Sequence, residues 1–329
     1  MRGKAKKIAE NVNMTWYFPF VFLGAGALIG LVKMTRQTLK LIDHIGNAAL
    51  VALMYVIGVN VGADDTVIRN IGLIGFQCLA ITSLALALSV AFVFLLEKTA
   101  LPLDKLKSRI SDGQASVVAD SSQKRSPLVL IIPLCIVFGV IAGYLAVPQS
   151  ALGMVHKCFL ISLAILYMTV GIGLSQNRGV FNYVKKLGWK VVLISAAILL
   201  GSMIGGAVAG LLMKIELHVS VLSACGMSYY SITGAFMTQA YGIQAGIYGF
   251  LVNVFREFFT VLLLPLLIRI GKGAPIAGAA AGNMDTMLVP VSKFVGVELG
   301  FVALITGTIL TIAVPVLSPV LARLFALLA

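Results

Sequence analysis

Charged residues are scarce in this sequence, and acidic residues are the scarcest. Only 11% of its 329 residues are charged, with 12 Asp and Glu against 25 Lys and Arg. Soluble domains average about 25% charged residues, so a water-soluble globular protein is excluded. Hydrophobic residues make up 60% of the chain, and several apolar runs reach the roughly 20 residues that a helix needs to cross a bilayer. Because no short alternating segments suggest a β-barrel, the composition predicts an all-α polytopic membrane protein.

Cysteine and histidine patterns that hold metals are also missing. The four cysteines lie in or beside apolar runs, without a CxxC pair or a Cys/His ligand spacing. No HExxH motif occurs, and the glycine clusters do not follow a soluble β-strand as a phosphate-binding loop would. We therefore predict buried free thiols, no metal site and no bound cofactor.

The basic residues indicate how the chain is oriented rather than a nucleic-acid partner. The net charge is +13, yet the Lys and Arg residues lie in short loops between apolar runs. With the N-terminus outside, the inner loops 33–40, 97–127 and 175–190 hold 13 of them, against Arg69, Lys157 and Lys214 in the outer loops. The positive-inside rule thus places both termini outside the cytoplasmic membrane, although four basic residues in the tail 1–15 oppose this.

Eight apolar segments are predicted to span the membrane. They are 16–32, 41–63, 72–96, 128–147, 157–174, 188–213, 245–268 and 299–325. The stretch 97–127 is a polar linker rich in Ser, Asp, Lys and Gln, and it divides the chain loosely in two.

The first six spans contain a repeat with an offset of 113 residues and no gap. Gly26 and Gly30 match Gly139 and Gly143 at this offset, and the spans and loops align as well. Each copy, 16–96 and 128–213, holds three spans, and an odd number of crossings inverts the second copy. Inverted three-helix repeats are a recurrent construction of secondary transporters.

A weaker repeat follows in the remaining region, 214–329. The segment SACGMSYYSITG (223–234) resembles AAAGNMDTMLVP (279–290), with Gly226 over Gly282, and each precedes a long apolar span. Both segments are small, polar and broken by Gly or Pro, and irregular backbone at membrane depth needs cover from protein or a wet cavity. We favour two re-entrant elements and eight spans. If both segments cross instead, there are ten spans.

Glu257 lies in the middle of the apolar run 245–268. A carboxylate at bilayer depth costs about 2.5 kcal/mol or more and usually marks a substrate or ion path. On a helix it shares one face with Gly246, Gly249, Asn253 and Thr260. Packing between helices accounts for the small residues of this stripe, but not for the carboxylate. The adjacent Arg256 points elsewhere and either pairs with another carboxylate or structures the bundle.

Other polar groups lie in the two broken segments and after the second span. Asp285 is either a helix N-cap or a ligand. Asp64 and Asp65 form a solvated helix end or an acidic mouth that attracts a cation. The hydroxyls of the first broken segment satisfy freed backbone groups or bind an amino acid. We include Ser228, Tyr229, Ser231 and Thr233.

Four blocks of the sequence resemble those of the bacterial lysine exporter family. The resemblance rests on GMSYYSITG (226–234), NVFREFFTVLLLPLLIR (253–269), GAAAGNMDTMLVPV (278–291) and IGVNVGADD (57–65), and it covers nearly the whole chain from about residue 18. The family exports L-lysine and its toxic analogues, and its intramembrane acids are essential. The resemblance places the family's transport glutamate at Glu257 and a second acid at Asp65, or at Asp64 in a shifted register.

We therefore expect a secondary transporter, not an enzyme, that exports lysine by alternating access. A buried carboxylic acid favours its protonated form, so it can exchange a proton for a lysine ammonium, which gives proton antiport. Two other functions remain open. One is a cation/proton antiporter or another organic-solute carrier, and the other is an intramembrane aspartyl enzyme that uses Glu257 and Asp285. The oligomeric state is not predicted.

Overall fold

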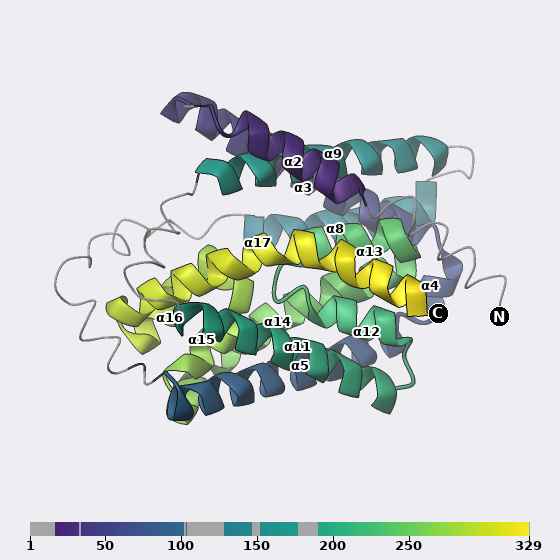
Figure 1. Ribbon diagram of the computed structural model, residues 1–329. Helices are drawn as coiled ribbons and strands as arrows, with labels where there is room; N and C mark the ends of the chain where they lie inside the picture. The colour runs from purple at the N-terminus through teal and green to yellow at the C-terminus, as the bar shows by residue number, and fades with distance from the viewer. Residues whose placement is uncertain are drawn as a thin grey trace.

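The computed structural model describes residues 17–32, 34–101, 103, 128–146, 152–176 and 190–328. Within these ranges the chain is built from helices without strands (Figure 1). The predicted tail 1–15 and most of the linker 97–127 lie outside the described residues. The first six long helices are α2 (Phe18–Ile29), α3 (Arg36–Gly62), α5 (Ile71–Thr99), α8 (Leu128–Ala146), α9 (Leu152–Gln176) and α11 (Lys190–Leu212). A short helix, α4 (Asp65–Arg69), joins α3 to α5.

The rest of the chain alternates short helices with two long ones. In chain order they are α12 (Leu217–Ala224), α13 (Tyr230–Tyr241), α14 (Ile243–Ile270), α15 (Gly273–Ala279), η2 (Ala280–Met284), α16 (Leu288–Val295) and α17 (Val297–Leu328). Six helices of the described chain, α3, α5, α9, α11, α14 and α17, are long and apolar enough to cross a membrane. The other two predicted spans correspond to α2 and α8, whose apolar parts are shorter. The predicted class, an all-α polytopic membrane protein, is confirmed.

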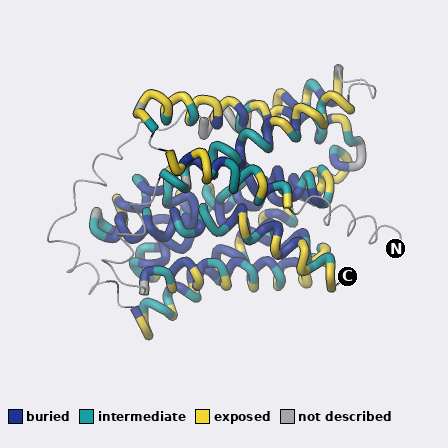
Figure 2. Tube along the Cα trace, turned by 45° about the horizontal axis from the view of Figure 1, so that its top comes forward, coloured by how far each residue is buried: buried dark blue, intermediate teal, exposed yellow. Residues whose placement is uncertain are grey.

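Large apolar side chains cover the outside of the helices. Phe138 is 61% exposed, Leu145 74% and Leu211 73%. In Figure 2 exposed residues follow the outer sides of the helices, whereas buried residues gather along the middle of the molecule. Soluble monomers rarely expose so much contiguous apolar surface, so these outward faces suit contact with lipid.

The two helix triplets contact one another at positions that obey the 113-residue offset. Gly26 of α2 lies against the carbonyl of Met168 in α9, where a Cβ would not fit. The equivalent pair is Gly139 of α8 against Tyr55 of α3, with the same close approach of backbone to backbone. The repeated glycines are therefore needed because small residues let membrane helices approach closely.

The central pair of equivalent helices shows that the second copy is inverted. Ser89 of α5 and Ser202 of α11 are 113 residues apart, and their hydroxyl oxygens lie 3.0 Å from each other. Gly205 lies against Ala85, so α11 runs antiparallel to α5. A pseudo-two-fold axis between the two serines therefore relates the triplets, as the inverted-repeat prediction requires.

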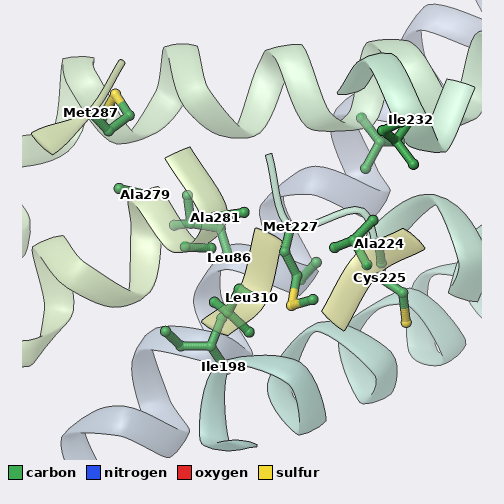
Figure 3. Packing of buried hydrophobic residues seen from close by; sticks show 14 of the residues in the cluster. Leu86, Ile198, Ala224, Cys225, Met227, Ile232, Ala279, Ala281, Met287 and Leu310 are labelled. Carbon is green, nitrogen blue, oxygen red and sulfur yellow. The ribbon is translucent and has the colours of Figure 1, made fainter. Parts of the chain in front are cut away.

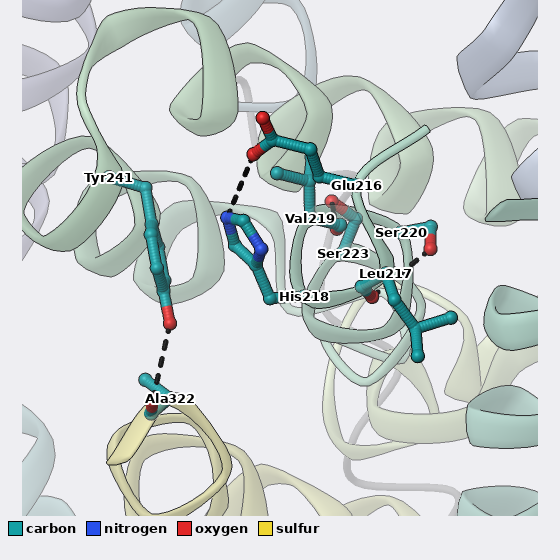
Figure 4. Close-up of polar contacts among 8 residues, drawn as sticks. All are labelled: Glu216, Leu217, His218, Val219, Ser220, Ser223, Tyr241 and Ala322. Carbon is teal, nitrogen blue, oxygen red and sulfur yellow. Dashed lines mark hydrogen bonds and ion pairs between the residues drawn. The ribbon is translucent and has the colours of Figure 1, made fainter. Parts of the chain in front are cut away.

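The first broken segment is a re-entrant hairpin made of α12 and α13, here called hairpin 1. Its two ends meet, because the rings of His218 and Tyr241 are 4.5 Å apart (Figure 4). Its tip turns at Met227 and Ser228, whose φ angles of 48° and 77° lie in the left-handed region. Hairpin 1 thus enters the bundle and returns to the same end.

The second broken segment, α15, η2 and α16, forms hairpin 2 and enters from the opposite end. Contacts along helix α17 show at which end of the bundle each hairpin enters. Near its start Gly300 packs on Ser292 of α16, and further along Gly307 packs on Asn283 of η2. Near its end, the Tyr241 hydroxyl at the base of hairpin 1 donates to the Ala322 carbonyl at 3.4 Å. Figure 1 shows α15 and α16 at one end and α12 at the other.

The tips of the hairpins touch in the middle of the bundle. The amide of Ala281 in hairpin 2 donates to the carbonyl of Met227 in hairpin 1 at 2.9 Å. Both residues lie in the buried apolar cluster, together with Leu86 and Leu310 (Figure 3). Two re-entrant hairpins with eight further helices, six of them long enough to cross a membrane, are the arrangement that we favoured from the sequence over ten crossings.

Candidate functional site

Helix α14 passes between the two hairpins and packs on both. Gly246 and Gly249 lie against α13 of hairpin 1, where an added Cβ would overlap Thr238 and Met237. At the other end of the stripe, Gly278 of hairpin 2 lies against Thr260. The small residues of the polar stripe thus serve helix packing, and its middle lies at the level of the two tips.

Asn253 holds the tip of hairpin 1 in place. Its Oδ1 accepts from the Ser228 amide at 2.8 Å, and its Nδ2 donates to the carbonyls of Ser223 and Gly249 at 2.9 and 2.7 Å. The side chain is fully buried, and both of its N–H donors have protein partners. Asn253 therefore satisfies backbone groups that the break in the helix frees.

Arg256 holds hairpin 2 in place in a similar way. Its guanidinium is 1% exposed and donates to the carbonyls of Gly278 and Ala277 at 3.1 and 3.0 Å. A third bond, at 2.7 Å, goes to the Ser202 hydroxyl on α11. The two carbonyls belong to the C-terminal end of α15, where a cation is favoured by the helix dipole. Of the two predicted roles, structuring of the bundle matches these contacts.

Glu257 faces the residues that follow the tip of hairpin 2. The side chain of Thr286 lies near its carboxylate, and Asp285 is close enough to interact with it electrostatically. Thr286 also bonds through its amide to Oδ1 of Asp285. Two carboxyl groups from different elements therefore share one small region.

This region is accessible from outside the protein although protein atoms surround it. Asp285 is exposed and Glu257 is only half-buried, yet protein atoms enclose most of the space around each carboxyl group. Groups with both properties line a recess rather than an outer surface. Glu257 therefore lies beside the second broken segment.

Hairpin 1 contributes two aromatic hydroxyls to the same region. The phenol of Tyr230 interacts electrostatically with both Glu257 and Asp285, and that of Tyr229 interacts with Asp285. The ring of Tyr230 packs edge-on against Phe250 of α14, with centroids 5.5 Å apart. Both hairpins and α14 therefore meet around the two acids.

Other residues that the sequence analysis selected have contacts of their own. Thr233 donates to the Tyr229 carbonyl at 2.8 Å, so its hydroxyl serves the first turn of α13. Ser231 is buried in the same turn. Asp64 accepts from the Val67 amide at 3.3 Å and caps α4. Asp65 begins α4, but its side chain lies outside what the structure describes, so its predicted role stays a prediction.

Sequence reasoning did not select Thr286 or Tyr167, which the structure adds. Thr286 directly follows Asp285 in the broken segment, so its hydroxyl was a readable signal. Tyr167 lies on α9 of the second triplet and interacts electrostatically with Tyr229. Nothing in the sequence indicates that contact, because it joins elements about 60 residues apart through the tertiary fold.

Comparison with known proteins identifies the family. The family model described as lysine exporter LysO matches residues 133–322 of the chain. This match covers more than half of the chain. The chain belongs to the lysine exporter LysO family.

Two curated relatives agree with this assignment. The lysine exporter LysO of Escherichia coli (strain K12) is 24% identical over 302 residues, which cover 88% of this chain and 94% of the relative. A putative lysine exporter of Haemophilus influenzae is 24% identical over 182 residues, 55% of this chain and 92% of the relative. The LysO family match includes both hairpins, α14 and Tyr167, whereas Asp64 and Asp65 precede it.

Proposed function

We propose that this chain exports L-lysine and its toxic analogues from the cytoplasm. The supporting observation is the Glu257 carboxylate, which lies in a recess beside a second acid, where hairpins from opposite ends of the bundle meet. A lysine side chain carries an ammonium with three donors, and such a charge needs a negative partner inside a membrane protein. The names of both relatives favour lysine over an inorganic cation.

The transport cycle is proposed to exchange lysine for protons. A carboxylic acid that is held away from bulk water favours its protonated form, and an arriving ammonium favours the ionised form. Proton and lysine thus compete for Glu257, which couples their movements. Asp285 provides a second acceptor beside it, and movement of one hairpin at a time opens the recess alternately to the two sides.

The charge of Glu257 is tested with Glu257→Gln, which keeps the shape of the side chain. In proteoliposomes that contain the purified protein, counterflow of labelled lysine is expected to fall at least 100-fold, because a neutral amide does not balance the ammonium. Net lysine efflux through the unchanged protein is expected to accelerate when the exterior is acidified, as proton antiport requires.

The matched control is Glu216→Gln, the same change at a glutamate whose side chain is 60% exposed at the base of hairpin 1. It is expected to retain counterflow. Normal lysine counterflow in Glu257→Gln would overturn the proposal. Saturable exchange of inorganic cations without lysine movement would favour the cation/proton antiporter instead.

A further inference from the structure

Helix α13 begins inside the bundle without a side-chain cap. Its N-cap residue, Tyr229, makes no capping hydrogen bond. The first amide of the helix to reach a carbonyl of the preceding turn is that of Thr233, which donates to the Tyr229 carbonyl at 3.2 Å. The amides of Tyr230, Ser231 and Ile232 precede that bond, so they are the donors that every helix start leaves without an intrahelical partner. Such an end carries a partial positive charge.

Two buried hydroxyls have no partner among the described residues, one in the turn before this helix and one near the Tyr229 side chain. Ser228 is 5% exposed, and its Oγ has no hydrogen-bond partner among the described residues. The hydroxyl of Tyr167 is fully buried and also has no partner among the described residues. It lies close enough to the Tyr229 hydroxyl for the two to interact electrostatically. Buried polar groups are nearly always paired. Two unpaired donors beside an uncapped helix start therefore indicate a ligand that accepts hydrogen bonds.

We propose that Ser228, Tyr167 and the first amides of α13 form a subsite for the α-carboxylate of the transported amino acid. The inference rests on the proposed function and specifies its chemistry. A helix N-terminus binds anions through its amides and its dipole, and half-helices in transporters bind substrate carboxylates in this way. Hydroxyls of Ser and Tyr add donors to the same anion.

The charges of the whole site then match those of lysine. Lysine carries two ammonium groups and one carboxylate. The recess offers two acids, Glu257 and Asp285, and one helix start that favours an anion. Tyr229 links the two parts, because its phenol interacts electrostatically with Asp285 on one side and with Tyr167 on the other. The subsite thus distinguishes an amino acid from a diamine of the same length.

The experiment compares ligands with and without the carboxylate. Counterflow of labelled L-lysine in proteoliposomes is inhibited with unlabelled L-lysine, L-lysine methyl ester or cadaverine, for the unchanged protein, Ser228→Ala and Tyr167→Phe. Each substitution removes one hydroxyl and little else. We expect the inhibition constant of lysine to rise about tenfold, whereas those of the ester and of cadaverine change less than twofold.

Ser195→Ala is the matched control. It removes another buried hydroxyl that lacks a partner among the described residues, on α11 and outside both hairpins. It is expected to leave all three constants unchanged. A rise for all three ligands in Ser228→Ala and Tyr167→Phe would assign these residues a merely structural role, and unchanged lysine inhibition in both variants would also overturn the subsite.

Failure of this proposal is distinguishable from failure of the proposed function. If Glu257→Gln transports lysine normally, lysine export through Glu257 is wrong whatever the inhibitors show. If Glu257→Gln is inactive but the ratio of ester to lysine inhibition is the same in all Ser228 and Tyr167 variants, only the carboxylate subsite is wrong.

Discussion

Two neighbouring residues of opposite charge have different tasks at the centre of this protein. Arg256 and Glu257 are adjacent in sequence, but successive helical side chains point about 100° apart. The guanidinium is directed to the carbonyls of hairpin 2 and to Ser202, and Glu257 faces Thr286. The cation therefore holds the scaffold while the acid remains available to a ligand.

The role of Arg256 is testable by removal of its donors. Arg256→Met leaves the carbonyls of Ala277 and Gly278 and the hydroxyl of Ser202 without their present donor, and each such buried group costs about 1–3 kcal/mol. We expect a total loss of about 3 kcal/mol or more, measured as a lower unfolding temperature of the detergent-purified protein. Arg256→Lys is expected to recover only part of the lost stability, because one ammonium does not span three acceptors.

Arg269→Gln is the control, since this arginine lies exposed at the end of the same helix. Its unfolding temperature is expected to stay within a degree or two of the unchanged protein. Equal stability of Arg256→Met and Arg269→Gln would contradict the bridging role.

At this scale the sequence predicted the acid but not its surroundings. Glu257 was detectable because a carboxylate in an apolar run is costly. Asn253 lies on the same predicted face of the helix, and the structure shows that its amide binds hairpin 1. Tyr167 was missed, because an ordinary tyrosine in an apolar span carries no sign of its distant partner. Periodicity shows which face a residue occupies and not what lies opposite.

The glycines explain how the helices of the two triplets come so close. The contact of Gly26 with Met168 and that of Gly139 with Tyr55 are one interaction used twice. The glycine spacing was readable in sequence as the 113-residue repeat. The choice between crossing and re-entrant segments was not, since it depends on contacts such as His218 with Tyr241.

The packing of α2 on α9 is tested with Gly26→Ala. The new Cβ would overlap the Met168 carbonyl, and overpacking of a well-packed contact costs about 1–3 kcal/mol. We expect a lower unfolding temperature. A similar decrease is expected for Gly139→Ala, the equivalent position 113 residues later.

Gly24→Ala provides the control on the same helix, because a Cβ there meets nothing within 4 Å. It is expected to be neutral or slightly stabilising, since alanine favours helix by up to about 1 kcal/mol over glycine. The explanation is wrong if Gly24→Ala and Gly26→Ala lower the unfolding temperature alike.

In the molecule as a whole, the two hairpins enter the bundle from opposite ends. Hairpin 1 begins after Lys214 and hairpin 2 after Lys272, at opposite ends of the bundle. The structure sets this relation, and the loop charges predict its absolute direction, with hairpin 1 outside.

Cysteine labelling in whole cells tests the orientation. In a background without the four native cysteines, Lys214→Cys is expected to react with an impermeant maleimide added outside, and Lys272→Cys only after the membrane is permeabilised. The reverse pattern would invert the protein in the membrane, and labelling of both from outside would contradict entry of the hairpins from opposite ends.

A single peptide hydrogen bond, from Ala281 to Met227, joins the two tips at the middle of the bundle. Buried apolar side chains, among them Leu86 and Leu310, surround this contact. Separation of the tips breaks a bond worth about 0.5–1.5 kcal/mol and also gives up the packing of the buried residues around it. In the proposed transport cycle, this tip-to-tip contact is the one that has to open when one hairpin moves.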